Sequence, residues 1–520
     1  MLKASKLKEI IIDGHDLTLE EFVAVARYNA IVKIDEKVIE KMNKARDFVK
    51  KIANNNEVAY GITTGFGELS KVSVDKEKSN ILSTNLVLSH AVATGNPYNI
   101  EQVRGMILLL SNNLSHGYSG CRSVLIEILI EMLNKNVIPF VPEKGSLGAS
   151  GDLAPLSHIG LVLLGKGKAY YKGQLLEGKK AMDLADIKTL DTLVNKEGLA
   201  LTNGTHTMTS IAALNIYDAL KIEVLADTIA SMSFTALGGQ LNAFNPKIHQ
   251  LRRQISQQKV AENLLALTKD SKLVNDFQGK RVQDAYTLRC IPQVHGASRD
   301  SIAHSKTIVE RELNAITDNP LIFPDEELVL SGGNFHGEPI AQVMDFLAIA
   351  ISEYASIAER RLERMVNPSL SNGLSPFLTI DAGVNSGYMI VQYSAASMVS
   401  ENKVLAHPAS VDSIPSSANQ EDFVSMGTTA ARKCSWIIQN TLSTLAYELL
   451  TAIQAIDIRL LNKSKDELSP VHKEIYQRIR RDIDFMQEDR EIRIDIEKIE
   501  NIIRSQDLLE IIYKYCPKIF

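Results

Sequence analysis

The chain has 520 residues, a formal net charge of −5 at pH 7 and 45% hydrophobic residues, which is the composition of a globular protein that can bury a large core. The near-neutral charge gives no electrostatic basis for binding nucleic acid or an anionic membrane. Because the chain has no membrane-length apolar run, no secretory signal and four scattered cysteines without a CxxC pair, we expect a cytoplasmic protein without a metal site.

Residues 1–205 are predicted to form a loop-rich, mostly helical N-terminal part. Apolar residues recur at helical spacing over 103–113 and 122–133, and glycine-dense loops separate these short segments. A small β-hairpin is predicted within 168–176, with its turn at Lys172 and Gly173.

The segment Gly145-Ser-Leu-Gly-Ala-Ser-Gly-Asp-Leu-Ala-Pro155 is the most unusual of this part. Its three glycines within seven positions predict a tight turn with little side-chain bulk. The ordinary interpretation is a connection between two helices. The chemical interpretation is that the amide nitrogen of Gly151 is pressed against the carbonyl carbon of Ala149, so that the backbone cyclises. Loss of two waters would then convert Ser150 into a dehydroalanine within a methylidene-imidazolone ring, an electrophile that replaces a bound cofactor.

Residues 206–520 are predicted to form a central helical bundle followed by C-terminal helices. The stretches 208–237, 340–366 and 428–457 carry helical apolar spacing without an internal glycine or proline. Each would be about 40 Å long at a rise of ~1.5 Å per residue. Their apolar excess suggests that they are buried between subunits.

Six blocks of the chain, in the same order, resemble the motifs of the aromatic amino-acid ammonia-lyases and aminomutases. They are Tyr60-Gly-Ile-Thr-Thr-Gly-Phe-Gly67, the segment from Gly145 to His158, Asn203-Gly-Thr205, Gln283-Asp-Ala-Tyr-Thr-Leu-Arg289, Asn334-Phe-His-Gly337 and Asn419-Gln-Glu-Asp422. The resemblance implies a mainly α, homotetrameric ammonia-lyase-like fold with active sites shared between chains. It also implies that Ala149, Ser150 and Gly151 form the methylidene-imidazolone, with no external cofactor, and that ammonia is eliminated from an amino acid.

The resemblance further assigns catalytic residues. Tyr60 matches the catalytic tyrosine, on a loop whose glycines suit closure over a substrate. A tyrosine with its ordinary pKa of ~10 is a poor base, so an electropositive site must lower that pKa. Tyr286 and Glu421 match the other catalytic positions.

Four further residues match positions that bind the substrate or line the electrophile. Arg289 is expected to grip the substrate carboxylate with its planar guanidinium, and it lies one helical turn after Tyr286. Asn203 is expected to hydrogen-bond the carbonyl of the electrophile. Gln283 and Phe335 match positions that line the ring and the substrate.

Two sites favour histidine as the substrate, with urocanate as the product. Ser89 and His90 resemble the pair found in histidine lyases at this place, and a histidine suits hydrogen bonding to an imidazole. Glu421 also resembles the histidine-active members. Its carboxylate can pair with an imidazole N–H, whereas beside a phenyl ring it would be desolvated without a partner.

Two departures leave alternatives open. Phe423 stands where histidine lyases usually carry a second histidine, and His206 stands where many carry glutamine. The alternatives are a tyrosine-active lyase or aminomutase on the same scaffold, and a non-catalytic helical scaffold in which the Ala-Ser-Gly turn never cyclises.

Overall fold

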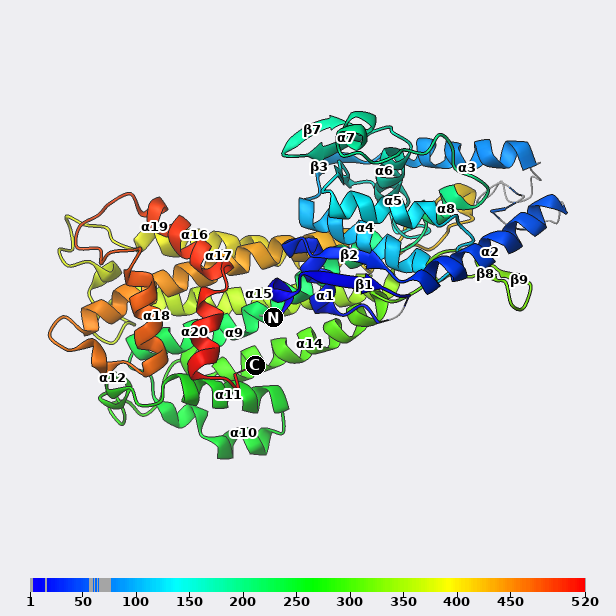
Figure 1. The fold of residues 1–520 in the computed structure, drawn as a ribbon. Helices are drawn as coiled ribbons and strands as arrows, with labels where there is room; N and C mark the ends of the chain where they lie inside the picture. The colour runs from blue at the N-terminus through cyan, green and yellow to red at the C-terminus, as the bar shows by residue number, and fades with distance from the viewer. Residues whose placement is uncertain are drawn as a thin grey trace.

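The computed structural model describes residues 3–14, 16–55, 59, 61–62, 64 and 76–519, with the backbone alone at 76 and 77. The described chain is mainly helical, as predicted (Figure 1). Its N-terminal helices are α1 (Leu19–Tyr28), α2 (Glu36–Asn54), α3 (Lys76–His90), α4 (Ile100–Ser115), α5 (Val124–Asn134), α6 (Leu153–Leu163), α7 (Gly178–Leu184) and α8 (Glu197–Thr202).

Three long helices form the centre of the molecule and confirm the predicted bundle. They are α9 (His206–Ala236), α15 (Glu338–Val366) and α17 (Gly427–Arg459), each within two residues of its predicted bounds. α17 packs against both α9 and α15. Almost every residue of α9 is buried, which explains why its apolar and small residues continue around the whole helix. Gly238 follows with a φ of 65°, a left-handed conformation that ends a helix and favours glycine.

The remaining helices surround this centre. Between α9 and α17 lie α10 (Pro246–Arg252), α11 (Ile255–Leu267), α12 (Lys272–Asn275), α13 (Tyr286–Arg289), α14 (Ile291–Glu312) and α16 (Met389–Leu405). The C-terminal helices are α18 (Pro470–Arg480), α19 (Ile492–Arg504) and α20 (Asp507–Tyr515). Short 3-10 turns occur at Ala4–Lys6, Leu241–Phe244, Pro376–Leu378, Ser417–Asn419 and Lys465–Glu467.

The strands are short and pair in four small sheets. β1 (Glu9–Ile12) and β2 (Ile31–Ile34) are parallel, whereas β3 (Thr94–Pro97) and β5 (Pro142–Lys144), like β8 (Leu321–Phe323) and β9 (Leu328–Leu330), are antiparallel. β4 (Ile138–Pro139) pairs with the predicted hairpin, formed by β6 (Lys168–Tyr171) and β7 (Gln174–Glu177). Lys172 and Gly173 form its turn with φ values of 49° and 78°, as the two-residue turns of hairpins require.

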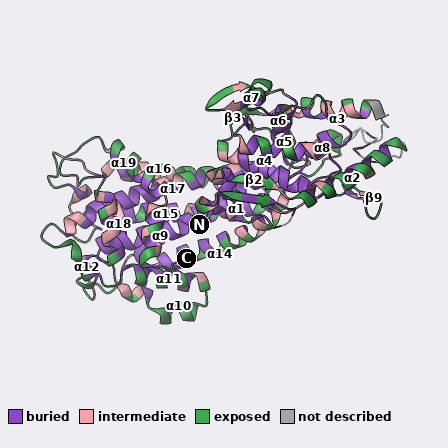
Figure 2. Ribbon diagram, in the orientation of Figure 1, coloured by how far each residue is buried: buried purple, intermediate pink, exposed green. Residues whose placement is uncertain are grey.

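The hydrophobic core is continuous between the N-terminal part and the bundle. Figure 1 shows α3 to α8 as a lobe at one end of the long helices, and Figure 2 shows buried residues running from this lobe through the bundle. A single core cluster contains Leu156 of α6 as well as Ile453 of α17. The boundary at residue 205 therefore marks the start of α9 inside a shared core, and the division into 1–205 and 206–520 stays a proposal.

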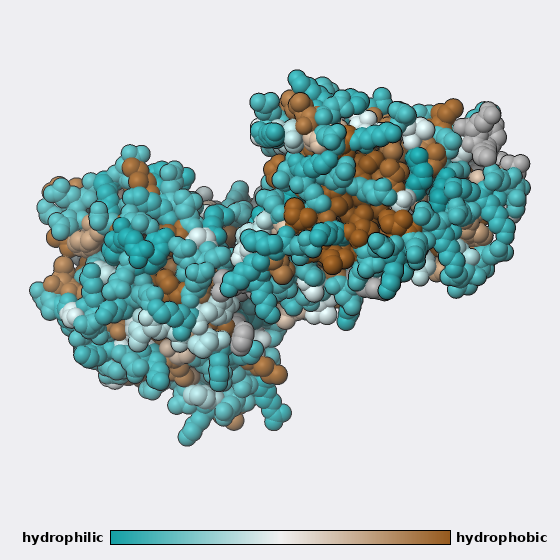
Figure 3. Space-filling view, in the orientation of Figure 1, coloured by the Kyte–Doolittle hydropathy of each residue, from teal (hydrophilic) through white to brown (hydrophobic). Residues whose placement is uncertain are grey.

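Apolar side chains also gather on part of the surface. Figure 3 shows a mainly hydrophilic face with a broad hydrophobic area over the N-terminal part, near α4 and β2.

By length and composition α15 is apolar enough to cross a membrane, the one such helix among the described residues. However, 67% of its most apolar window is buried, and α15 packs against α14, α16 and α17. This is the environment of a core helix in a bundle.

Candidate active site

The Ala149-Ser150-Gly151 segment is the corner of a tight turn before α6. Gly148 and Gly151 face each other across it as an isolated bridge, and Gly148, Ser150 and Gly151 have φ values of 84°, 51° and 80°. A positive φ is costly for serine, by about 1–3 kcal/mol. The turn is therefore held in a conformation that this sequence would not adopt without support from its surroundings.

Backbone hydrogen bonds from Gly204 supply that support. The amide of Gly204 donates to the carbonyl of Ser150 at 3.2 Å, and the amide of Asp152 donates to the carbonyl of Gly204 at 2.9 Å. The approach is so close that a Cβ added to Gly151 would overlap the backbone of Gly204. A Cβ on Gly148 would likewise overlap Ser425. Glycine is thus required sterically at both positions.

The side chain of Asp152 fixes the turn to the ends of two long helices. This fully buried carboxylate accepts hydrogen bonds from the amides of Thr207 and Met208, both at 2.9 Å, at the start of α9. It also accepts from Ser146 at 2.8 Å and from Thr428 in the first turn of α17. Burial raises the pKa of Asp152, and these hydrogen bonds act in the opposite direction.

Sequence analysis did not single out Asp152. Its position directly before α6 is a helix-capping signal, but the side chain makes no capping bond to α6. It binds the free amides of α9 instead, and those amides are the natural partners of a carboxylate.

Glu421 contacts the serine of the turn. The hydroxyl of Ser150 donates to Oε1 of Glu421 at 3.0 Å. Glu421 is held by two backbone hydrogen bonds with Ser416, of 2.9 and 3.2 Å. The same loop then passes beside the turn, where the amide of Met426 donates to the carbonyl of Leu147 at 3.3 Å. A carboxylate thus lies next to the side chain predicted to become the electrophile.

His90 also lies close to the turn, at the end of α3. It lines a cavity of about 250 Å³ together with Ala149 and Gly151. Burial lowers the pKa of His90, and the Leu86 carbonyl and the charge of Glu421 partly oppose this. His90 and Glu421 are therefore brought into one electrostatic environment around the turn, although they are far apart in the sequence.

Asn203 and Phe335 belong to segments that border the same turn. Asn203 is buried immediately before Gly204, and its Nδ2 donates to the carbonyl of Asn319 at 2.8 Å. Its Oδ1 has no partner among the described residues. Phe335 is half-buried and lies two residues before Gly337, which packs against Met208 in the first turn of α9.

Gln283, Tyr286 and Arg289 are not brought to the turn within one chain. They lie in and just before α13, whose preceding segment is bonded to the far end of α9: Arg281 donates to the carbonyl of Gly238 at 2.7 Å. The turn is bonded to the opposite end of α9 through Asp152. Because α9 has 31 residues, the two ends are about 45 Å apart.

Within α13 the side chains nevertheless form a group. The guanidinium of Arg289 lies over the ring of Tyr286, 4.6 Å from its centroid, and Tyr286 is 71% exposed. The remaining predicted residue, Tyr60, lies outside the described residues.

The two departures have different environments. Phe423 is exposed and stacks on His336, with ring centroids 6.1 Å apart. His206 is buried in the first turn of α9, and burial lowers its pKa to about 4. His206 is therefore neutral near pH 7 and adds no positive charge at the start of α9.

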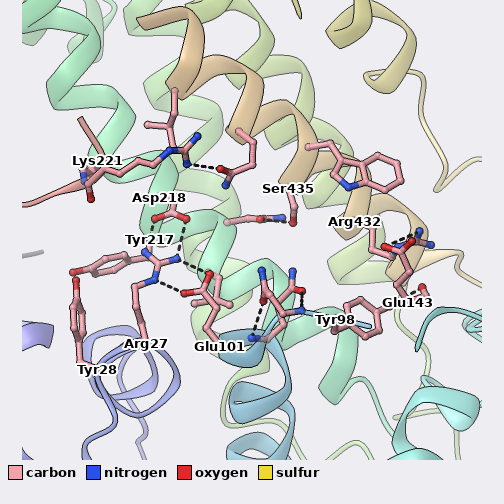
Figure 4. A pocket seen from close by; sticks show the side chains of 18 of the residues that line it. Arg27, Tyr28, Tyr98, Glu101, Glu143, Tyr217, Asp218, Lys221, Arg432 and Ser435 are labelled. Carbon is pink, nitrogen blue, oxygen red and sulfur yellow. Dashed lines mark hydrogen bonds and ion pairs between the residues drawn. The ribbon is translucent and has the colours of Figure 1, made fainter. Parts of the chain in front are cut away.

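A larger cavity lies elsewhere, between α1, α4, α9 and α17, and has a volume of about 520 Å³ (Figure 4). Its charged side chains already have partners within the chain. Arg27 contacts Glu101 and Asp218, both at 2.6 Å, and Lys221 donates to two backbone carbonyls at 2.7 Å. We assign no chemistry to this cavity. Across the described ranges, no group of His, Cys, Asp and Glu side chains is arranged to hold a metal.

Comparison with known proteins finds one family over most of the chain. The family described as aromatic amino acid lyase matches residues 17–481. Histidine ammonia-lyase 1 of Fusobacterium nucleatum is 50% identical over 98% of this chain and 98% of its own length. A histidine ammonia-lyase of Caldanaerobacter subterraneus is 50% identical over 97% of this chain and 98% of its own.

Solved structures of related enzymes have the same fold. Histidine ammonia-lyase from Trypanosoma cruzi superposes with a TM-score of 0.90 at 38% identity, covering 98% of this chain and 96% of that one. Tyrosine aminomutase from Streptomyces globisporus superposes with a TM-score of 0.91 at 36% identity, covering 98% and 99%.

Proposed function

The chain belongs to the aromatic amino acid lyase family, and we propose that it is a histidine ammonia-lyase, which eliminates ammonia from L-histidine to give urocanate. It is a carbon–nitrogen lyase, as family membership and near-full-length relatives at 50% identity require. The observation that carries the choice of histidine is the position of Glu421. Its carboxylate lies 3.0 Å from the Ser150 hydroxyl and shares the surroundings of the turn with His90.

The turn fits the self-formed methylidene-imidazolone that we propose as the electrophile. Gly151 is tightly packed against Gly204 without a side chain, and the flanking hydrogen bonds hold Ala149, Ser150 and Gly151 in a strained corner. Strain of this kind favours a reaction that relieves it. Once formed, the group supplies an electrophilic carbon to the substrate amine. We propose that Asn203, buried beside it, stabilises charge at its carbonyl.

We propose that His90 and Glu421 recognise the imidazole ring. The carboxylate of Glu421 is an acceptor-only group when ionised, and it would be left unpaired beside a phenyl ring. The site therefore favours a substrate ring that carries N–H donors. Phe335 supplies a half-buried apolar wall near the same place. Tyr60 remains our proposed catalytic base, by its match to the family motif.

The site needs a second copy of the chain if Gln283, Tyr286 and Arg289 act in it. These residues lie about 45 Å from the turn of their own chain, by the length of α9. Several large apolar side chains of α15, α16 and α17 are also exposed in a single copy: Phe346, Ile349, Ile390, Tyr393 and Trp436. We propose a homotetramer in which α13 of one chain approaches the turn of another. The cysteines are all free, and we retain the cytoplasm as the proposed compartment.

Initial rates on histidine, tyrosine and phenylalanine test the proposed substrate. We expect histidine to be converted to urocanate with a kcat/KM at least tenfold above that for tyrosine. A tyrosine-active lyase or aminomutase is the alternative, since structures of tyrosine aminomutase superpose equally well. A higher kcat/KM for tyrosine, with coumarate or β-tyrosine as product, would contradict the proposal.

A further inference from the structure

Ser89 is placed to decide which ring nitrogen of His90 carries the proton. Both residues lie in the last turn of α3 and both line the cavity beside Ala149 and Gly151. The Ser89 hydroxyl donates to the carbonyl of Leu86, one helical turn earlier, at 3.2 Å. The hydroxyl oxygen of Ser89 also lies 3.0 Å from Nδ1 of His90.

The first of these contacts indicates the direction of the second, because the distance between Ser89 Oγ and His90 Nδ1 fits either direction. A hydroxyl has one proton, and the proton of Ser89 is donated to Leu86. The oxygen can then only accept from His90, so Nδ1 carries the N–H.

The neutral ring has one donor nitrogen and one acceptor nitrogen. Burial lowers the pKa of His90, so the neutral form prevails near pH 7. With the proton on Nδ1, the remaining nitrogen, Nε2, has a free lone pair. The carboxylate of Glu421, which also lies beside the turn, is likewise an acceptor.

We propose that Ser89 is a positioning residue that holds His90 as the Nδ1–H tautomer, so that Nε2 meets the substrate ring as a hydrogen-bond acceptor. This inference rests on the proposed histidine specificity and extends it by one residue. Two acceptors favour a ring with N–H donors, as imidazole has. They penalise a ring that can only accept, such as the pyridine of 3-(3-pyridyl)alanine, because two lone pairs would then face each other.

Nitrogen-15 spectra of the assembled enzyme, labelled at histidine, test the tautomer directly. The signals of His90 are assigned by difference from a His90→Gln variant. We expect the protonated nitrogen to be Nδ1 in the wild type, a measurable share of the Nε2–H form in Ser89→Ala, and the wild-type pattern again in Ser89→Thr. Alanine is a good helix former, so α3 should persist in the first variant. Protonation at Nε2 in the wild type, or an unchanged spectrum in Ser89→Ala, overturns the proposal.

Kinetics on the same variants test the consequence for specificity. For Ser89→Ala we expect KM for histidine to rise roughly three- to tenfold with kcat nearly unchanged, the loss of one neutral hydrogen bond. The preference for histidine over 3-(3-pyridyl)alanine should fall by a similar factor, and Ser89→Thr should restore both. An unchanged preference in Ser89→Ala overturns the role in specificity. Inactivity of the wild type on histidine would contradict the proposed function alone, because the spectra report the tautomer without turnover.

Discussion

Single residues at this site act through the few atoms that they present to the turn. Ser150 is held at a positive φ with its hydroxyl donating to Glu421, and His90 lines a cavity together with Ala149 and Gly151. Arg289, by contrast, lies on an exposed helix with its guanidinium over the ring of Tyr286. Replacing each of these residues should therefore have a measurable kinetic effect.

Replacing His90 by Leu or Glu421 by Gln should reduce activity on histidine by about ten- to a hundredfold in kcat/KM. The Glu421 variant loses a charge-assisted contact of roughly 1.5–3 kcal/mol, and the His90 variant leaves a substrate N–H without its acceptor, at a cost of about 1–3 kcal/mol. Both variants should melt within a few degrees of the wild type, because both side chains are only half-buried. Steady-state kinetics and a thermal melt make the comparison. Wild-type rates on histidine in two normally folded variants would show that these residues do not recognise the substrate.

Arg289→Lys should lower kcat/KM for histidine by about ten- to a hundredfold. A lysine keeps the positive charge but loses the planar fork that binds both carboxylate oxygens. Arg493→Lys is the matched control, because Arg493 is an exposed residue of α19 paired with Glu497 on the same helix. If Arg289→Lys retains wild-type kcat/KM, the substrate carboxylate is bound elsewhere.

At the scale of the elements, the turn owes its shape to the helices that surround it. α9 and α17 both begin beside it, and Asp152 binds the start of each. Gly204, two residues before α9, holds the turn through backbone hydrogen bonds with Ser150 and Asp152. The Ala-Ser-Gly turn is thus packed closely against the residues at the start of α9.

Gly151→Ala should prevent formation of the electrophile. The added methyl would overlap the backbone of Gly204 and force the turn open, and the positive φ of Gly151 also disfavours alanine. Gly332→Ala is the control, since a Cβ there meets no atom within 4 Å. Intact mass should show the loss of two waters in the control and the unmodified mass in Gly151→Ala. A Gly151→Ala protein that still loses both waters would show that the close packing of Gly151 against Gly204 is not needed for cyclisation.

The long helices and the hairpin could be predicted from the sequence because their signals are local. Uninterrupted apolar spacing defined α9, α15 and α17, and Lys172-Gly173 defined the turn between β6 and β7. The capping of α9 by Asp152 could not be predicted, because it depends on how distant helices dock. The same holds for the distance between α13 and the turn, which depends on where α9 begins and ends.

At the scale of the whole molecule, one chain does not bring the predicted site residues together. His90, Glu421 and the turn lie at one end of α9, whereas α13 lies at the other. A symmetric assembly of antiparallel bundles would place α13 of one copy near the turn of another. The proposed tetramer would therefore be needed to complete each active site, and not only to stabilise the fold.

Two inactive variants should restore activity when they assemble together. Ser150→Ala removes the electrophile and Arg289→Glu removes the carboxylate clamp, and we place these defects in different chains of each site. Coexpression in equal amounts should return roughly a quarter of the wild-type sites, with a tetrameric mass by light scattering. Mixing the separately purified, already assembled variants is the control and should stay inactive. A fully active wild-type monomer, or no recovery in the mixed tetramer, would contradict shared sites.

The mass of the peptide that spans residues 149–151 in active enzyme tests the central claim most directly. We predict a mass lower than that of the unmodified sequence by two water molecules, together with turnover of histidine to urocanate. Ser150→Ala should lack the electrophile, fold with a normal melt and lose almost all turnover. An unmodified peptide recovered from enzyme that converts histidine at full rate would contradict the account.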